Sequence, residues 1–414
     1  MSRKRIRLDT DRMSDEGERL LAFLQDRIKG QDAAIRDIVK ADEISRSGLL
    51  QPDRPVYTGL FLGPSGVGKT LTAEMLAEYW FGSRNAFTKV SCEAMSEPHG
   101  IASLIGSPPG YVGHYDPSAK EGSPPVLAQS QIDRHDPQYG KDKEEIKKII
   151  TGLEDRLHQL DREIDSVVQS GFKDPKNHER LIKLQDEQDS LEKEAKKSLS
   201  QVHERPKNYR SIILFDELEK GNDTLHNLLL TIIDKGKLVL ANGMVTNFSR
   251  SVIILTSNVG SKEIADLIGK KHMGFTSTAS ADEDASVHDE IYQRARRAAQ
   301  DRFRPELLAR MDRISVFRPL TQLIIQQIMD AELRRFMKDM KDRFNISLIV
   351  DDAVREHILN EALDKPQEGA RLLRRKISSS LREPISRLKL RNMLPKPGGR
   401  LYVSWEEGRV VFSK

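Results

Sequence analysis

The sequence Gly63-Pro64-Ser65-Gly66-Val67-Gly68-Lys69-Thr70 fits the pattern G-x-x-x-x-G-K-[S/T] at every fixed position. The run before it, Tyr57 to Leu62, is typical of a short buried strand, and Leu71 to Tyr79 has the pattern of a helix. A glycine-rich turn between a strand and a helix lets backbone N–H groups converge on phosphates. We therefore expect all eight residues to contact a nucleotide, with Lys69 at the β- and γ-phosphates and the Thr70 hydroxyl on Mg²⁺.

Length and composition limit the class of protein. The chain has 414 residues, which predicts two to three domains, and its net charge of +4 gives no argument for nucleic acid as a partner. Cys92 is the single cysteine, so an intrachain disulfide framework is excluded and a reducing cytosol is favoured. No apolar run approaches the ~18 residues of a membrane span, and no signal peptide is visible. We expect a cytoplasmic protein that does not bind membranes.

Two later apolar runs predict the central strands of a sheet. Ser211 to Phe215 and Val252 to Leu255 are almost wholly apolar, as expected of parallel strands that are buried on both faces. Their alternation with helical segments predicts an α/β fold, in which helices flank a parallel sheet and the phosphate loop follows one of its strands.

Polar residues at the ends of these strands complete the candidate site. Asp216 follows the first run, where its carboxylate can join the Mg²⁺ shell, and Glu217 can act as the general base for the attacking water. Asn258 ends the second strand and can orient that water. An Asp-Glu pair can also cap a helix, and an Asn can be a simple turn residue. The phosphate loop upstream favours the catalytic interpretation.

Residues 141–204 interrupt this alternation with two heptad-like apolar patterns. The pattern predicts an antiparallel coiled-coil hairpin with arms of about 22 residues, each ~33 Å long. The breaker cluster Gly171 to Pro175 lies between the arms. The alternative is a pair of helices packed on the globular body. The first pattern comprises Ile146, Ile150, Leu153, Leu157, Leu160, Ile164 and Val167, and the second comprises Leu181, Leu184, Gln188, Leu191, Ala195, Ser198 and Val202.

The rest of the chain suggests two domains. We assign residues 1–320 to a large domain, which carries the insertion at 141–204, and residues 321–414 to a small, mainly helical C-terminal domain. Within the large domain one helical stretch is expected from Glu16 to about Arg46. In the small domain a β-hairpin is expected around Glu406-Glu407.

Taken together, these motifs resemble the AAA+ ATPases of the Clp unfoldase class, most of all the second ATPase module of ClpB- and ClpC-type proteins. The resemblance covers nearly all of the chain except the insertion and the first ~20 residues. The family's nucleotide-binding box is matched by Ile28 to Asp32, which implies a contact of Ile28 with the nucleotide. Gly369 to Arg371 matches the small-domain sensor, in which Arg371 touches the nucleotide of its own subunit.

The resemblance also implies a ring. Phe303 to Asp312 matches the segment whose second arginine, here Arg310, is the arginine finger. Such an arginine can be worth ~10³–10⁵ in hydrolysis rate. If Arg310 comes from a neighbouring subunit, active sites form only between subunits, and the family implies a homo-hexamer. The alternative for Arg310 alone is a surface ion pair.

The segment Pro108 to Gly113 matches the family's central-pore loop, with Tyr111 and Val112 facing the substrate. A bulky ring between glycines on a flexible loop can grip a polypeptide by non-specific apolar contact. We therefore expect an ATP-dependent, ring-forming unfoldase or remodelling chaperone that threads polypeptide through a pore. The alternative is an ATP-controlled scaffold or switch whose coiled coil binds one dedicated partner without threading. A nucleic-acid-directed motor is disfavoured because no DNA-binding motif is present.

The insertion point resembles that of HslU-type protease ATPases, which also carry an extra domain between the pore loop and the Asp-Glu strand. The partner of this insertion is unknown. Related protease-associated ATPases carry a hydrophobic-Gly-Phe/Leu tripeptide that docks a peptidase, and Met273-Gly274-Phe275 lies in the corresponding region. The resemblance therefore implies a Clp-type peptidase as a possible partner.

Overall fold

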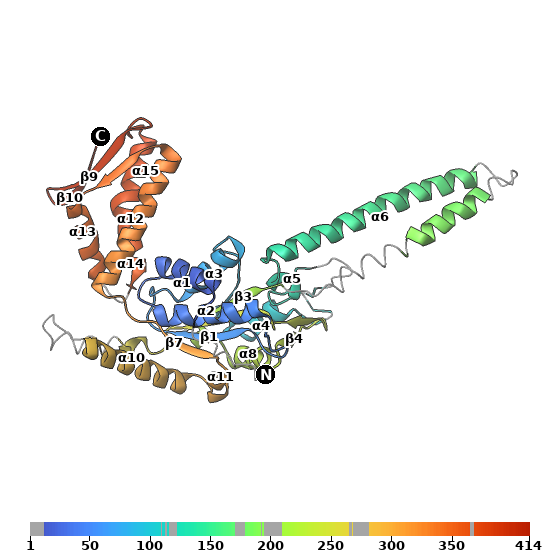
Figure 1. The fold of residues 1–414 in the computed structure, drawn as a ribbon, viewed down its shortest axis with the longest axis horizontal. Coiled ribbons are helices and arrows are strands. Elements are labelled where there is room, and N and C mark those ends of the chain that lie inside the picture. The colour runs from blue at the N-terminus through green and yellow to red at the C-terminus, as the bar shows by residue number, and fades with distance from the viewer. Residues whose placement is uncertain are drawn as a thin grey trace, which may run out of the picture. The chain divides into compact units, whose positions relative to one another are not determined.

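The computed structural model describes residues 12–108, 110–111, 114–115, 122–169, 179–191, 193, 209–264, 267, 281–364 and 368–414, with backbone alone for 98–99 and 281–288. The chain forms two compact units (Figure 1). The main unit comprises residues 1–128 and 212–414, and the insertion unit comprises residues 129–211.

The main unit begins with helices and strands that surround the phosphate loop. These are α1 (Asp15–Arg27), α2 (Asp32–Ser47), β1 (Tyr57–Leu62), α3 (Lys69–Phe81), β2 (Thr88–Ser91), the 3-10 helix η1 (Cys92–Met95) and α4 (Pro98–Ile105). After the insertion unit follow β3 (Ser211–Asp216), η2 (Leu218–Lys220), α8 (Asp223–Lys235), β4 (Lys237–Val239), β5 (Val245–Asn247), β6 (Ser251–Ser257), α10 (Ala281–Arg302), α11 (Pro305–Ala309) and β7 (Arg313–Val316).

A five-stranded sheet in the order β2-β3-β6-β1-β7 forms the centre of this unit. β1 pairs in parallel with β6 and with β7, and β2 pairs in parallel with β3. All residues of β1 and β6 are buried, as expected of strands covered on both faces. Because side chains alternate along a strand, Phe61, Ile212 and Ile254 point to one face, where they share a core with α1, α2 and α3.

The sheet places the ends of β1, β3 and β6 next to one another, because parallel strands present their carboxyl ends at one edge. The parallel sheet flanked by helices confirms the predicted fold class. One expectation is wrong: the stretch from Glu16 to Arg46 is not one helix but two. The chain turns between α1 and α2 at Gly30, whose φ of 77° is a left-handed conformation that continues neither helix.

The C-terminal part of the main unit is mainly helical, as predicted. Its elements are α12 (Gln322–Phe344), β8 (Ser347–Val350), α13 (Asp352–Leu363), α14 (Ala370–Ile377), the π-helical turn η4 (Ser378–Arg382), α15 (Glu383–Leu390), β9 (Arg400–Glu406) and β10 (Arg409–Ser413). The expected hairpin is present as antiparallel β9 and β10. β8 joins β9 in parallel and was not predicted, because it is only four residues long.

The insertion unit contains α5 (Gln129–Ile132) and the long helix α6 (Pro137–Gln169). A second helix spans residues 179–191, and Leu184 packs with Leu160 and Val167 of α6 in a small apolar core. Ile150, farther back along α6, is 38% exposed. The helices therefore pair along the predicted apolar positions, whereas the coiled-coil assignment itself stays a prediction. Residues 171–175, Ala195, Ser198 and Val202 lie outside the described residues.

Within the described part of the chain, no helix is both long and apolar enough to cross a membrane.

Candidate functional site

The phosphate loop has the backbone of an anion cradle. Gly63, Gly66 and Gly68 adopt φ angles of 139°, 77° and 112°, in the region that only glycine enters readily. α3 begins immediately afterwards at Lys69, so its first N–H groups and its dipole face the loop. The loop can therefore bind phosphate oxygens with backbone donors.

Lys69 lies at the centre of this cradle and is 8% exposed. Its Nζ donates to the carbonyl oxygens of Gly63 and Pro64 at 2.5 and 2.7 Å and to Asn258 Oδ1 at 2.9 Å. Burial lowers the pKa of Lys69 to about 8, although the carboxylates of Glu219 and Asp216 act in the opposite direction. Three oxygen acceptors thus hold the Lys69 ammonium in place, and burial makes it easier to deprotonate than an exposed lysine.

Asp216 ends β3 beside the first turn of α3. Thr70 Oγ1 and Thr256 Oγ1 donate to its Oδ1 at 3.4 and 2.6 Å, and Lys89 Nζ lies 2.8 Å from its Oδ2. Burial raises the pKa of Asp216, but the hydrogen bonds from Lys89 and Thr256 outweigh that effect, and the pKa lies below its usual value. A charged carboxylate beside a hydroxyl is a donor set of the kind Mg²⁺ binds.

Glu217 follows in a left-handed conformation, with φ 60° and ψ 54°, which is uncommon for a residue with a side chain. Its N–H donates to Thr256 Oγ1 at 3.1 Å, and its carboxylate Oε2 lies 2.8 Å from Lys220 Nζ. Thr256 therefore ties both Asp216 and Glu217 to the neighbouring strand β6. This conformation is the kind of local strain that concentrates at functional positions.

Asn258, one residue beyond β6, joins the same group. Its Oδ1 accepts from Lys69, and its backbone N–H donates to Glu219 Oε1 at 3.1 Å. The structure thus brings together Lys69, Thr70, Asp216, Glu217 and Asn258, the residues that the sequence placed at three strand ends.

The site opens into a cleft of about 340 Å³ that is lined by both the sheet side and the C-terminal side of the main unit. The two sides touch where the phosphate loop meets Gly369: Ala370 N donates to Gly66 O at 3.2 Å. A Cβ on Gly66 would lie 2.4 Å from the Glu368 carbonyl oxygen, so this approach requires glycine.

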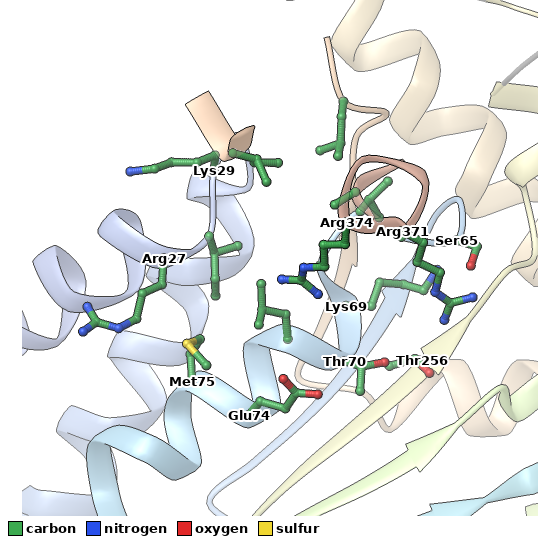
Figure 2. Close-up of a pocket in the computed structure, with 18 of the residues that line it drawn as sticks. Arg27, Lys29, Ser65, Lys69, Thr70, Glu74, Met75, Thr256, Arg371 and Arg374 are labelled. Atoms are coloured by element: carbon green, nitrogen blue, oxygen red, sulfur yellow. The ribbon is translucent and has the colours of Figure 1, made fainter. Parts of the chain in front are cut away.

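Arg371 and Arg374 line the cleft from α14, and their guanidinium groups point in different directions, with Arg371 on the side of Ser65 (Figure 2). Arg374 Nε donates to Glu332 Oε1 at 2.8 Å. Within the described residues the Arg371 side chain makes no hydrogen bond or ion pair, and its charge lowers the pKa of Lys69 by repulsion. Of the two, Arg371 is the cation with its charge available to the cleft.

Sequence reasoning assigned Ile28 to the site but missed Gln31 in the same segment. Ile28 is 3% exposed and lines the cleft. Gln31 is also buried; its Nε2 donates to Val67 O at 3.3 Å and to Arg318 O at 3.0 Å, and its Oε1 accepts from Arg318 N at 3.0 Å. The amide links the phosphate loop to the segment that leads into α12. The signal for Gln31 was its place inside the matched box Ile28 to Asp32, although no sequence pattern marks these contacts.

Lys89 and Thr256 were missed as well. Lys89 stands at an exposed position of β2, whose side chains alternate between buried and exposed, and reaches Asp216 from the next strand. Thr256 directly follows the apolar run of β6. Neither has a motif of its own, because both act through contacts between strands.

Arg310 is not among the residues that line the cleft. It follows α11, is 41% exposed, and forms an ion pair with Asp234 of α8. Arg54 Nη2 also donates to the Arg310 carbonyl oxygen at 3.3 Å. In a single subunit the finger candidate is thus held on the surface, away from its own nucleotide cleft.

Tyr111 is also outside the cleft. This residue is 71% exposed on the loop between α4 and α5. Val112, the other predicted pore residue, and Met273, Gly274 and Phe275, the predicted peptidase-docking tripeptide, lie outside the described residues.

Comparison with known families assigns the chain. Residues 54–121 and 144–314 match the AAA domain (Cdc48 subfamily), and residues 320–403 match the C-terminal, D2-small domain of ClpB protein. The first match alone spans more than half of the chain, so the chain belongs to the AAA family of ATPase domains and carries a nucleotide-binding site.

Among curated proteins, the chain is 29% identical over 405 residues to chaperone protein ClpB 2 of Nostoc sp., covering 97% of this chain and 35% of that protein. It is 30% identical over 376 residues to the ATP-dependent Clp protease ATP-binding subunit ClpC of Staphylococcus aureus, covering 90% of this chain and 35% of that protein. The chain therefore spans about a third of the length of these relatives.

Among solved structures, the fold is similar to that of S. cerevisiae Hsp104 in a complex with casein, in an extended conformation. The TM-score is 0.65 at 20% identity, with 97% of this chain and 53% of that chain covered. A closed-state structure of Hsp104 with ATPγS and casein gives a TM-score of 0.64 at 20% identity, covering 96% of this chain and 52% of that chain. These matches confirm the AAA+ fold inferred from the sequence.

Proposed function

We propose that this chain is the motor of an ATP-driven, ring-forming protein unfoldase or remodelling chaperone, which threads polypeptide through a central pore. The observation that carries the proposal is the pairing of two features on one body. Lys69, Thr70, Asp216, Glu217 and Asn258 converge at one edge of the sheet, and Tyr111 is exposed on a separate loop. The relatives named chaperone protein ClpB 2 and ATP-dependent Clp protease ATP-binding subunit ClpC support it, as do the Hsp104–casein structures.

In this proposal the substrate ATP lies in the cleft between the phosphate loop and α14. The loop and Lys69 bind its phosphates, Ile28 packs at the cleft wall, and Arg371 supplies positive charge from the C-terminal side. The oxygen donors Thr70 and Asp216 would hold Mg²⁺, which neutralises charge on the phosphates. The low pKa of Asp216 keeps that carboxylate charged.

Glu217 is the residue that accepts the proton of the attacking water, and Asn258 orients that water. Arg310 of one subunit completes the site of the next, so that hydrolysis requires a closed ring, for which we propose a hexamer. A cytoplasmic location is part of the proposal. A chain with a single cysteine forms no intrachain disulfide and therefore does not need an oxidising compartment.

The alternative, a scaffold or switch that does not thread, leaves the exposed Tyr111 ring without a task. The discriminating experiment measures ATP turnover and unfolding of a fluorescent model protein by the wild-type chain, Glu217→Gln and Tyr111→Ala. Glu217→Gln should bind ATP and assemble but lose at least ~10²-fold in turnover. Tyr111→Ala should keep turnover and lose unfolding.

Near-normal turnover in Glu217→Gln would remove Glu217 as the base. Equal unfolding by Tyr111→Ala and the wild type would support the switch. In the same preparations, Glu217→Gln with bound ATP traps substrates, so polypeptides that co-purify with it identify the natural substrate class.

A further inference from the structure

The loop that carries Tyr111 is closed at its base by the main chain. Val126 N donates to Ser103 O and Leu127 N donates to Leu104 O, both at 3.0 Å. Beyond this base Tyr111 is exposed, so its position depends on whatever else holds the loop.

The turn between β4 and β5 contacts this loop at two points. Ala241 N donates to Ile105 O at 2.9 Å near the base. Asn242 Nδ2 donates to Tyr115 O at 3.3 Å, on the far side of Tyr111 along the chain. The same Asn242 side chain accepts from Met244 N at 3.2 Å through Oδ1. One amide therefore both closes the hairpin turn and holds the loop.

The β4–β5 hairpin is itself fixed to the elements of the nucleotide site. It follows α8, which begins six residues after Glu217, and it leads into β6, whose end precedes Asn258. Phe248 N donates to Gly236 O at 2.7 Å across the hairpin base, and Thr246 and Phe248 are fully buried. A displacement of α8 or β6 would therefore move the hairpin as a unit.

We propose that Asn242 is a positioning residue that ties the Tyr111 loop to the β4–β5 hairpin, so that movement at the nucleotide site reaches Tyr111. This inference rests on the proposed threading function. The tie is one hydrogen bond from the Asn242 side chain to the Tyr115 carbonyl oxygen, which joins two segments 127 residues apart in sequence.

Asn242→Asp separates the two tasks of this side chain. The carboxylate keeps an oxygen for Met244 N, so the turn can form, but it has no N–H for Tyr115 O and places negative charge against that carbonyl. Asn247→Asp is the control for placing a carboxylate on the same hairpin. Asn247 lies at the opposite end of β5, and its Oδ1 accepts from Ser249 N at 2.9 Å, a bond that aspartate also keeps.

The first arm of the test reports loop order directly. Tyr111→Cys provides a single accessible thiol for a fluorophore, because Cys92 is buried. In the full chain with Mg-ATP, fluorescence anisotropy decay should show greater local motion of the probe in Asn242→Asp than in the wild type or Asn247→Asp.

The second arm keeps Tyr111 intact. Asn242→Asp should hydrolyse ATP within about twofold of the wild type but unfold about fivefold less substrate per ATP, the effect that loss of one hydrogen bond of average strength produces. Asn247→Asp should match the wild type in both assays.

Unchanged probe motion in Asn242→Asp would overturn the inference, independently of the ATPase and unfolding results. Increased motion with unchanged unfolding per ATP would also overturn it, because the tie would then not serve coupling. Normal unfolding by Tyr111→Ala would instead defeat the threading function, and the anisotropy arm would still decide whether Asn242 holds the loop.

Discussion

At the scale of single residues, Lys69 makes ATP binding depend on pH. Burial lowers its pKa to about 8 in the free protein, and phosphate oxygens would favour the charged form and raise it. The affinity for ATP should therefore be highest below about pH 8. It should fall, by at most about tenfold per pH unit, as the pH rises through that value. Titration with a fluorescent ATP analogue between about pH 7 and pH 9.5 measures this dependence.

Lys69→Arg is the control for that titration, because arginine stays charged over the whole range. Its affinity is expected to be weaker, since the guanidinium does not fit the three acceptors of the ammonium, but nearly independent of pH. Equal slopes for both proteins would show that another group titrates.

Much of the site could be predicted at this scale, because its residues occupy fixed positions in short motifs. Gly66, Lys69 and Asp216 each stand at a turn or strand end that the apolar pattern defines. Gln31 could not be found this way. Its hydrogen bonds to Arg318 span 287 positions in sequence, and only the folded sheet brings the two segments together.

At the scale of elements, the segment from α10 to α11 is attached to α8 and the turn before it by three arginines. Arg302 donates to the Glu219 carbonyl oxygen, Arg304 pairs with Asp223 at 3.0 Å, and Arg310 pairs with Asp234. The last pair holds the finger candidate within its own subunit, and no sequence motif marks Asp234. We therefore expect this pair to compete with a neighbouring subunit for the Arg310 guanidinium.

Asp234→Asn should raise ATP turnover of the assembled protein. Exposed ion pairs contribute ~0.2–1 kcal/mol, so the gain in available Arg310 is at most about fivefold. Steady-state ATPase rates at saturating ATP measure it, and Asp223→Asn, which removes the ion pair of Arg304 instead, serves as the control. A lower rate in Asp234→Asn would mean that the pair orients Arg310 productively.

The insertion unit leads to a second prediction about elements. Tyr139 and Tyr209 pack edge to face with ring centroids 5.2 Å apart, and Arg210 N donates to Asp136 at 2.8 Å, so the unit's first and last residues lie together. A short Gly/Ser linker in place of residues 141–204 keeps these contacts and closes a short loop at small entropic cost.

The shortened protein should remain folded and bind ATP as well as the full chain, because residues 1–128 and 212–414 form a compact unit by themselves. Circular dichroism and nucleotide titration test this. Insoluble protein, or a loss of ATP affinity, would show that the insertion supports the main unit. If the fold survives, loss of substrate unfolding alone would assign the insertion to partner or substrate binding.

At the scale of the whole molecule, the sequence predicted the parallel sheet, the helical C-terminal part and the paired insertion helices. Long apolar or heptad patterns in the sequence indicate such elements. The short strands β2, β4, β5, β7 and β8 were not predicted, since three or four residues carry too little periodicity to distinguish a strand from a loop. The β4–β5 hairpin is recognised in the folded chain from the antiparallel pairing of its two strands.

Because Arg310 lies outside the nucleotide cleft of its own subunit, we expect an active site to require two neighbouring subunits. Arg310→Ala should retain ATP affinity and lose hydrolysis, and Lys69→Ala should lose binding. When the two inactive proteins are mixed in equal amounts, about a quarter of the interfaces in randomly mixed rings join an intact phosphate loop to an intact finger. ATPase activity should return to a corresponding fraction of the wild-type rate. The control is a mixture of Arg310→Ala with the double variant Lys69→Ala/Arg310→Ala. This mixture contains no intact finger and should stay inactive. If mixed rings form, as subunit exchange of labelled proteins would show, and activity still does not return, Arg310 does not act across the interface.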